Sequence, residues 1–452
     1  MLGGNIMKSK LILGLQHMFA MFGATILVAI LVNGYFGSEI SIGQVTLFCA
    51  GAGTLLFHAL TRGKVPAFLG SSFAFLGGFA TIAALDTGNF ATMSMSEKFP
   101  YACGGVVVAG ALYFILAALF KAVGVKKVMR FLPPVVTGPI ILCIGLTLAP
   151  SAIANCSVNW FLALAAAIIV IVFTVWGRGM LKIIPILLGV VISYLVAGVM
   201  QLVGLTNADG SAIINTAVIT DASWVGIPQF TLAKFDITTI LVMAPIAIAT
   251  MMEHIGDISA ISATVGENFV ESPGLHRTLF GDGLATALAG FIGGPPNTTY
   301  GENTGVLALT GVYDPSVVRL AAIYAIILSF IPKFANIFTA IPTAIIGGIS
   351  FLLYGMISII GVRNLTENHV DFTKSRNLIV AAATVVTGLG MKDGITIAGT
   401  PIHLTSLALA AIVGIVLNAI LPGKDYEFGK NSAGDANQGI AISTDARQST
   451  ED

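Results

Sequence analysis

Fourteen apolar segments, most of them near the length of a membrane-spanning helix, account for most of this 452-residue sequence. A spanning helix needs about 20 mainly apolar residues. Only 10% of the residues are charged, whereas soluble domains carry about 25%. The sequence therefore predicts an all-α polytopic membrane protein. Its segments lie near residues 11–33, 41–60, 65–84, 101–120, 133–153, 159–176, 183–203, 238–263, 278–294, 296–312, 317–338, 343–361, 377–391 and 401–421.

Basic residues indicate how these segments are oriented. If the N-terminus is cytoplasmic, only four of the 22 Lys and Arg residues lie outside, namely Lys98, Lys234, Lys333 and Lys392. Cytoplasmic loops carry the excess of Lys and Arg, so we expect a multi-pass protein of the cell inner (plasma) membrane with both termini cytoplasmic. The hydrophilic stretch 423–452 is predicted to be a disordered tail. The zero net charge gives no sign of a nucleic-acid partner.

One apolar segment is broken and also carries a carboxylate. Residues 290–311 contain paired prolines, several glycines and Glu302. A charge at the bilayer centre costs at least ~2.5–3.5 kcal/mol, and non-helical backbone is tolerated at that depth only inside protein or along a cavity. The coincidence of both features predicts a binding site here.

Segments seven apart in the sequence share features, which predicts a 7+7 inverted repeat. The shared features are an acceptor followed by histidine, a proline five residues before a glycine, and an interrupted span. They occur at Gln16-His17 and Glu253-His254, at Pro133–Gly138 and Pro342–Gly347, and at Gly70–Phe73 and Asn297–Gly301. Because seven is odd, the second copy enters from the opposite side of the membrane. Interrupted helices at matching positions mark the binding site of many secondary transporters.

The two interrupted spans, segments 3 and 10, indicate the chemistry of the ligand. Ser71 or Ser72, and Thr298 or Thr299, are suitable N-cap residues for half-helices, and the interruptions can also accommodate short β-strands. A helix that starts inside the membrane directs unpaired N–H groups toward the cavity. Glu253 and Glu302 add hydrogen-bond acceptors. Donors and acceptors together suit a planar, neutral ligand such as a nucleobase.

Residues 297–311 resemble the signature of the nucleobase–ascorbate transporter family. The family pattern of an acidic or amide residue, Asn, any residue, Gly, four residues and Thr is met by Glu302, Asn303, Gly305 and Thr310. The Tyr-Gly-Glu-Asn form resembles the bacterial uracil permease branch. Similar likenesses occur at residues 16–23, 70–75, 253–256 and 351–355.

The resemblance implies a proton-coupled uracil symporter that works by alternating access, with no cofactor or metal and no enzymatic activity. It implies a core domain (residues 1–132 and 235–340, segments 1–4 and 8–11) that holds the substrate. A gate domain (133–234 and 341–422, segments 5–7 and 12–14) would form a homodimer. Glu253 and Glu302 would accept hydrogen bonds from uracil, and the N–H groups of Phe73 and Gly301 would donate to it. The resemblance assigns substrate binding to Ser72, Phe73, Glu253, Tyr300, Gly301, Glu302 and Tyr354.

One position departs from the family pattern. Similar uracil permeases often carry a histidine four residues after Glu253, where this chain has Asp257. Residues i and i+4 share a helix face, and two carboxylates repel when both are ionised. We therefore expect Asp257, Glu253 and Glu302 to carry the coupled proton. The residues expected to support the site are Gln16, His17, His254, Asp282 and Asn303.

Other functions remain open from the sequence. A xanthine, uric acid or other purine permease of the same family is the main alternative, because some purine carriers have Asp at the place of Asp257. A channel is another alternative. An intramembrane aspartyl hydrolase could use Asp257 and Asp282, but Leu279 stands where the Gly-x-Gly-Asp form needs its first glycine. The four scattered cysteines give no metal-site spacing.

Overall fold

The computed structural model describes residues 2–37, 42–124, 127, 130, 132–207, 210–392, 394–396, 403–423 and 426. Every expected apolar segment overlaps at least one helix. Within the described residues, seven helices are long and apolar enough to cross a membrane. The count rises to eight if the pair Pro315–Ser329 and Pro332–Phe338, bent by 94°, is one span. The chain is thus a mostly helical protein with several apolar helices, and fourteen spans stay a prediction. Most of the expected tail, 423–452, lies outside the described residues.

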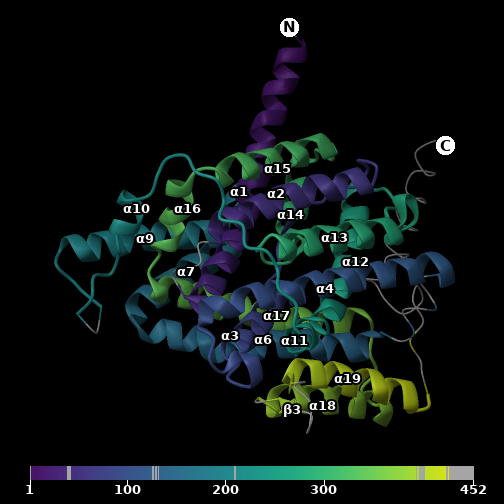
Figure 1. The fold of residues 1–452 in the computed structure, drawn as a ribbon. Helices are drawn as coiled ribbons and strands as arrows, with labels where there is room; N and C mark the ends of the chain where they lie inside the picture. The colour runs from purple at the N-terminus through teal and green to yellow at the C-terminus, as the bar shows by residue number, and fades with distance from the viewer. Residues whose placement is uncertain are drawn as a thin grey trace.

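The helices and strands are arranged as follows (Figure 1). The first half contains α1 (Leu2–Phe36), α2 (Gly43–Leu60), β1 (Leu69–Ser71), η1 (Phe73–Phe75), α3 (Leu76–Ala83), η2 (Gly88–Phe90), α4 (Met95–Val123), α6 (Pro134–Ser157), α7 (Trp160–Trp176), α8 (Met180–Ile183), α9 (Pro185–Leu202) and α10 (Ala217–Thr220). The second half contains α11 (Ile237–Met243), α12 (Ile246–Val265), η3 (Val270–Gly274), α13 (Leu275–Phe291), β2 (Asn297–Thr299), α14 (Gly301–Thr310), α15 (Pro315–Ser329), α16 (Pro332–Thr339), α17 (Thr343–Glu367), α18 (Ser375–Gly390), β3 (Ile395–Thr396), β4 (His403–Leu404) and α19 (Ser406–Ile420).

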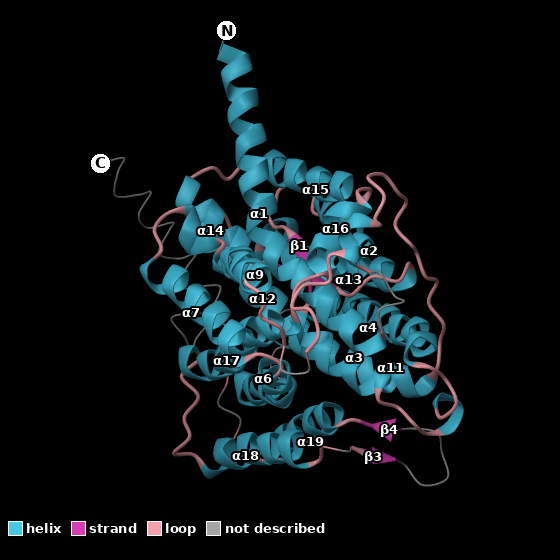
Figure 2. Cartoon of the chain, turned by 90° about the vertical axis from the view of Figure 1, so that its left-hand side faces the viewer, coloured by secondary structure: helices cyan, strands magenta, loops and turns pink. Residues whose placement is uncertain are grey.

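The helices pack in two groups. In one, α4 lies along α13 and α2 lies along both α13 and α15. In the other, α6 lies along α17, α7 contacts α9 and α17, and α18 contacts α19 and α6. Figure 2 shows α18 and α19 as a layer beyond α6 and α17, on the side away from α15 and α2.

Two three-residue strands join the interrupted spans. β1 and β2 pair antiparallel, with Leu69 opposite Thr299 and Ser71 opposite Asn297. The pairing continues at both ends, where the N–H of Ser72 donates to the carbonyl of Pro296 (2.8 Å) and that of Tyr300 to the carbonyl of Phe68 (3.0 Å). This backbone therefore has its hydrogen-bond partners inside the protein, as non-helical backbone at membrane depth requires.

The strands correct the expected N-caps. Thr298 and Thr299 lie within β2, and Tyr300 is the N-cap of α14. Ser71 lies within β1; Ser72 does precede η1, but its hydroxyl makes no capping hydrogen bond. The reason is that the strand pairing extends to Thr299, so Thr298 and Thr299 have extended backbone. Their side chains therefore project from the strand and do not cap the first turn of α14.

A buried lysine contacts the C-terminal end of α3, the helix of the first broken span. Lys98 is 7% exposed, and its Nζ donates to the carbonyls of Ala83 (3.1 Å) and Leu85 (2.5 Å) at the end of α3. A cation at a helix C-terminus is favourable because it complements the negative end of the helix dipole. Lys98 therefore stabilises a helix whose N-terminal end points into the protein.

Glycines allow α6 and α17 to approach closely. A Cβ added at Gly145 of α6 would lie 2.7 Å from the backbone nitrogen of Ser358 and closer still to the carbonyl oxygen of Tyr354. Both atoms belong to the backbone of α17 and cannot rotate away. The packing of these two helices thus depends on the absence of a side chain at Gly145.

We expect Gly145→Ala to lower the thermal unfolding temperature of the detergent-purified protein, because overpacking typically costs about 1–3 kcal/mol. Gly198→Ala in α9 is the matched control, since a Cβ there meets no atom within 4 Å and alanine favours a helix over glycine. Equal unfolding temperatures for the two variants would contradict this account of the contact.

Candidate functional site

The starts of η1 and α14 meet α12 beside the strand pair. α12 contacts η1, β2 and α14, and α1 contacts β1 and α14. Neither η1 nor α14 has a side-chain cap on its first N–H groups. Phe73, the first residue of η1, is half-buried, and Gly301, the first residue of α14, is exposed. Two sets of uncapped backbone donors therefore open toward one region.

Glu253 and Glu302 lie in this region. Glu253, on α12, is exposed, although the next two residues of the helix are buried; Glu302, in the first turn of α14, is half-buried. Burial nevertheless dominates the environment of both carboxylates. Both side chains are therefore accessible yet surrounded by protein, and we call this accessible region beside η1 and α14 the opening. Glu253 also interacts electrostatically with Glu302, so the two carboxylates lie near each other.

Asp257 is the third acidic residue near this opening, one turn after Glu253 on α12. Its Oδ2 accepts a 2.6 Å hydrogen bond from the Thr299 hydroxyl, and it interacts electrostatically with Glu253 and Glu302. The bond joins α12 to the last residue of β2, directly before Tyr300 and Gly301. The sequence analysis did not single out Thr299 as the partner of Asp257, although it lies inside the signature segment.

The fourth acidic residue, Asp282, is held by His254. Both side chains are fully buried, and Nδ1 of His254 lies 3.1 Å from Oδ2 of Asp282. Asp282 lies within α13, so this pair joins α12 to α13 directly behind Glu253. His254, one of the residues expected to support the site, thus lies against Asp282 of α13. Within the described residues, no hydrogen bond from another residue reaches the carboxylates of Glu253 or Glu302, which distinguishes them from Asp257 with its hydrogen bond from Thr299. Asp282 differs from them in its close contact with His254.

His17, another residue expected to support the site, contacts the half-helix α14 through Asn303. The Asn303 amide donates to the carbonyl of His17 (3.0 Å) and lies 3.2 Å from its ring Nδ1. Both residues are buried. The neighbouring Gln16 is half-buried, and its Oε1 has no hydrogen-bond partner among the described residues. The contact fixes the second residue after Gly301 against α1, so it positions the start of α14.

Two tyrosines were assigned to the pocket. Tyr300 is buried, and its hydroxyl donates to the carbonyl of Ser71 (2.8 Å) and accepts from Thr25 (3.3 Å). It therefore holds β1 and α1 together beside the opening. Tyr354 is 1% exposed, and the groups that act on its hydroxyl are Tyr35, Ser151 and Ser350 rather than the carboxylates. A contact of Tyr354 with substrate stays a prediction.

The strands are also fixed from behind by polar contacts that the sequence analysis missed. The Thr54 hydroxyl accepts from the N–H of Leu69 (2.9 Å), and the Thr286 hydroxyl donates to the carbonyl of Asn297 (2.8 Å). Asn297 also donates to the carbonyl of Cys49 (3.0 Å). The sequence shows such a polar residue within an apolar segment, but it does not show which residue is its hydrogen-bond partner. Among the described residues, no group of three or more His, Cys, Asp and Glu side chains is placed to hold a metal ion.

Solved transporter structures share this fold. The transmembrane domain of the cyanobacterial bicarbonate transporter BicA aligns with a TM-score of 0.53 and 15% identity, covering 89% of this chain and 97% of that one. The murine solute carrier 26 family member A9 anion transporter aligns with a TM-score of 0.63 and 11% identity, covering 91% and 67%. At these identities the likeness concerns the fold alone.

The sequence comparisons are more specific. A family profile described as "Permease family" matches residues 8–397. The uracil permease of Bacillus caldolyticus is 40% identical over 427 residues, 91% of this chain and 92% of that protein, and that of Bacillus subtilis (strain 168) is 38% identical over 90% and 91%. A putative pyrimidine permease of Escherichia coli (strain K12) is 36% identical over 91% and 89%. The chain therefore belongs to this permease family, the nucleobase–ascorbate transporters.

Proposed function

We propose that this chain imports uracil across the cytoplasmic membrane by proton-coupled symport. The observation that carries the proposal is that Glu253 and Glu302, whose carboxylates accept no hydrogen bond from another described residue, lie in the same region as the first N–H groups of η1 and α14, which have no side-chain cap. The names of the relatives, uracil and pyrimidine permeases, support the same class of substrate.

Uracil has two carbonyl oxygens and two ring N–H groups in one plane. The backbone N–H groups of Phe73 and Gly301 would donate to the carbonyls, and Glu253 and Glu302 would accept from the N–H groups. A simple anion would be repelled by two glutamates, and a simple cation would gain nothing from the backbone donors. Ser72, whose buried hydroxyl has no partner among the described residues, borders the same site.

The coupled proton would reside on the carboxylates of α12 and α14. Glu253, Asp257 and Glu302 interact electrostatically in surroundings dominated by protein, where several ionised carboxylates cannot coexist cheaply. A proton taken up by one of these carboxylates would reduce the negative charge of the site while the substrate crosses the membrane. Asp257 is the proposed coupling group, because Thr299 joins it to the segment that presents Gly301.

Alternating access would follow from movement of a core domain (1–132 and 235–340) against a gate domain (133–234 and 341–422). The packing supports a seven-segment inverted repeat. α4 with α13 corresponds to α15 with α2, α7 with α17 to α18 with α6, and α7 with α9 to α18 with α19. In each case, shifting both helices of one pair by seven segments along the chain gives the other pair. A homodimer through the gate and cytoplasmic termini belong to the same proposal.

A purine permease is the second candidate, because Asp257 stands where similar uracil permeases often have histidine. A hydrolase has less support: Asp257 is bonded to Thr299 and Asp282 to His254, an arrangement unlike a pair of aspartates that share a water. The family and its structural neighbours are transporters.

We expect Glu302→Gln and Glu253→Gln each to weaken uracil binding by about 10- to 100-fold, since a hydrogen bond to a charged group contributes about 1.5–3 kcal/mol. Isothermal titration of the detergent-purified protein would measure it. Glu267→Gln, an exposed position just beyond α12, is the matched control. Wild-type affinity in either site variant would contradict the assignment.

Asp257→Asn should retain uracil binding and uracil exchange but lose accumulation driven by a pH gradient, because asparagine cannot take up the proton. Uptake by proteoliposomes, with and without a protonophore, measures this. If uptake still follows the pH gradient and still collapses with the protonophore, Asp257 is not the coupling group.

Competition separates the two substrate classes. We expect excess unlabelled xanthine or uric acid to leave radiolabelled uracil uptake by whole cells unchanged, because the similar proteins are named uracil and pyrimidine permeases. Strong inhibition by xanthine would favour the purine permease. Saturable uptake that depends on a proton gradient is also expected, whereas flux that does not saturate would indicate a channel.

A further inference from the structure

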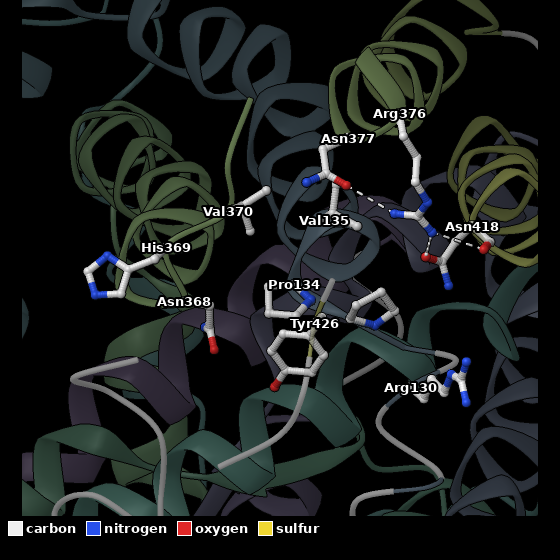
Figure 3. Close-up of a pocket in the computed structure, with 11 residues that line it drawn as sticks. Arg130, Pro134, Val135, Asn368, His369, Val370, Arg376, Asn377, Asn418 and Tyr426 are labelled. Atoms are coloured by element: carbon white, nitrogen blue, oxygen red, sulfur yellow. Dashed lines mark hydrogen bonds between the residues drawn. The ribbon is translucent and has the colours of Figure 1, made fainter. Parts of the chain in front are cut away.

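A second polar pocket lies away from the carboxylates, where four helix ends meet. It is lined at the start of α6 by Pro134 and Val135, after α17 by Asn368, at the start of α18 by Arg376, and near the end of α19 by Asn418 (Figure 3). Arg130, Tyr426, Pro133, His369, Val370 and Asn377 complete the lining. We call it the Arg130–Arg376 pocket. The transport proposal uses none of these residues.

The charge of Arg376 has no acidic partner among the described residues. Its guanidinium is half-buried and, in the described chain, donates to four uncharged oxygens: the side chain of Asn418 (2.6 Å), the carbonyl of Asn418 (3.0 Å), the side chain of Asn377 (3.0 Å) and the carbonyl of Leu421 (3.4 Å). No Asp or Glu appears among the described lining residues. The carboxylate of Asp371, six residues before Asn377, is bonded to Thr373 instead. The guanidinium is thus held in place by uncharged partners, and no described acidic residue pairs with it.

Arg130 adds a second guanidinium to the same pocket. It is exposed, and in the described part of the chain no hydrogen bond or ion pair engages it. The starts of α6 and α18 also border the pocket, and neither has a side-chain cap, so their positive dipole ends add to the field. Figure 3 shows the Arg376 side chain fixed by Asn377 and Asn418 above the rings of Pro134 and Tyr426.

We propose that the Arg130–Arg376 pocket binds a phosphate group between its two guanidiniums. The planar guanidinium of Arg130 can donate two hydrogen bonds to phosphate at once. Arg376, four of whose five N–H groups already donate to protein oxygens, adds one further N–H and its positive charge. Arg376 is already oriented, so little conformational freedom is lost on binding. A bound phosphate would connect the segment before α6 with α18 and α19, and would thereby stabilise the helix group that contains α6 and α17–α19.

The test uses the full-length protein in detergent, with inorganic phosphate as the probe and chloride at equal ionic strength as the reference. We expect phosphate to raise the unfolding temperature in a saturable way, and Arg130→Gln to raise the apparent Kd about tenfold or more. Arg363→Gln is the matched control, because Arg363 pairs with Glu367 on α17 and does not line the pocket. It should change the Kd less than twofold. Equal elution of all samples in size-exclusion chromatography checks that each variant is folded.

A second arm identifies the source of the phosphate. Wild type and Arg130→Gln are placed in nanodiscs of phosphatidylcholine with or without phosphatidylglycerol. A stabilisation by phosphatidylglycerol that Arg130→Gln abolishes, with no effect of inorganic phosphate, supports the site and assigns it to a lipid headgroup. Stabilisation by inorganic phosphate that depends on Arg130 supports it as a site for soluble phosphate. The proposal is overturned if neither probe gives an Arg130-dependent effect, or if Arg363→Gln weakens binding as much as Arg130→Gln.

Discussion

The pairing of β1 with β2 is the interaction on which the rest of the site depends. Two apolar spans are interrupted, and the backbone they expose cannot remain unpaired away from water. Three ladder positions, extended by Ser72 to Pro296 and by Tyr300 to Phe68, provide the partners. The ladder stops at the starts of η1 and α14. The first N–H groups of these two helices have no side-chain cap, and we propose that a ligand with carbonyl groups binds there.

The acidic residues around the ladder divide into two kinds. Asp257 is bonded to Thr299 and Asp282 to His254, so these two join α12 to β2 and to α13. Glu253 and Glu302 receive no hydrogen bond from another residue in the described chain and remain accessible. This division places the free acceptors beside the free donors. The hydrogen bond from Thr299 also connects Asp257, the proposed proton-binding residue, to the strand that precedes Gly301. A change in the protonation of Asp257 can therefore alter the position of this strand.

Much of this was predictable from the sequence. Apolar runs located the helical segments, because a membrane protein must satisfy its backbone within each segment. The prolines and glycines around Glu302 located the interruption, and the signature at Glu302 and Asn303 indicated the family. The strand pairing was harder to place: Thr298 and Thr299 are equally good N-caps and strand residues, and only the partner strand decides between them. Thr299, Thr54 and Lys98 act through contacts with residues distant in sequence, which periodicity does not reveal. The Arg130–Arg376 pocket likewise depends on four helix ends that only the fold brings together.

A structure of the protein with uracil bound tests the central claim most directly. The account predicts that the ring lies between η1 and α14, with its N–H groups within hydrogen-bond distance of the carboxylates of Glu253 and Glu302 and its carbonyl oxygens near the N–H groups of Phe73 and Gly301. Uracil bound elsewhere, or a ring in this opening that contacts neither glutamate, would contradict it.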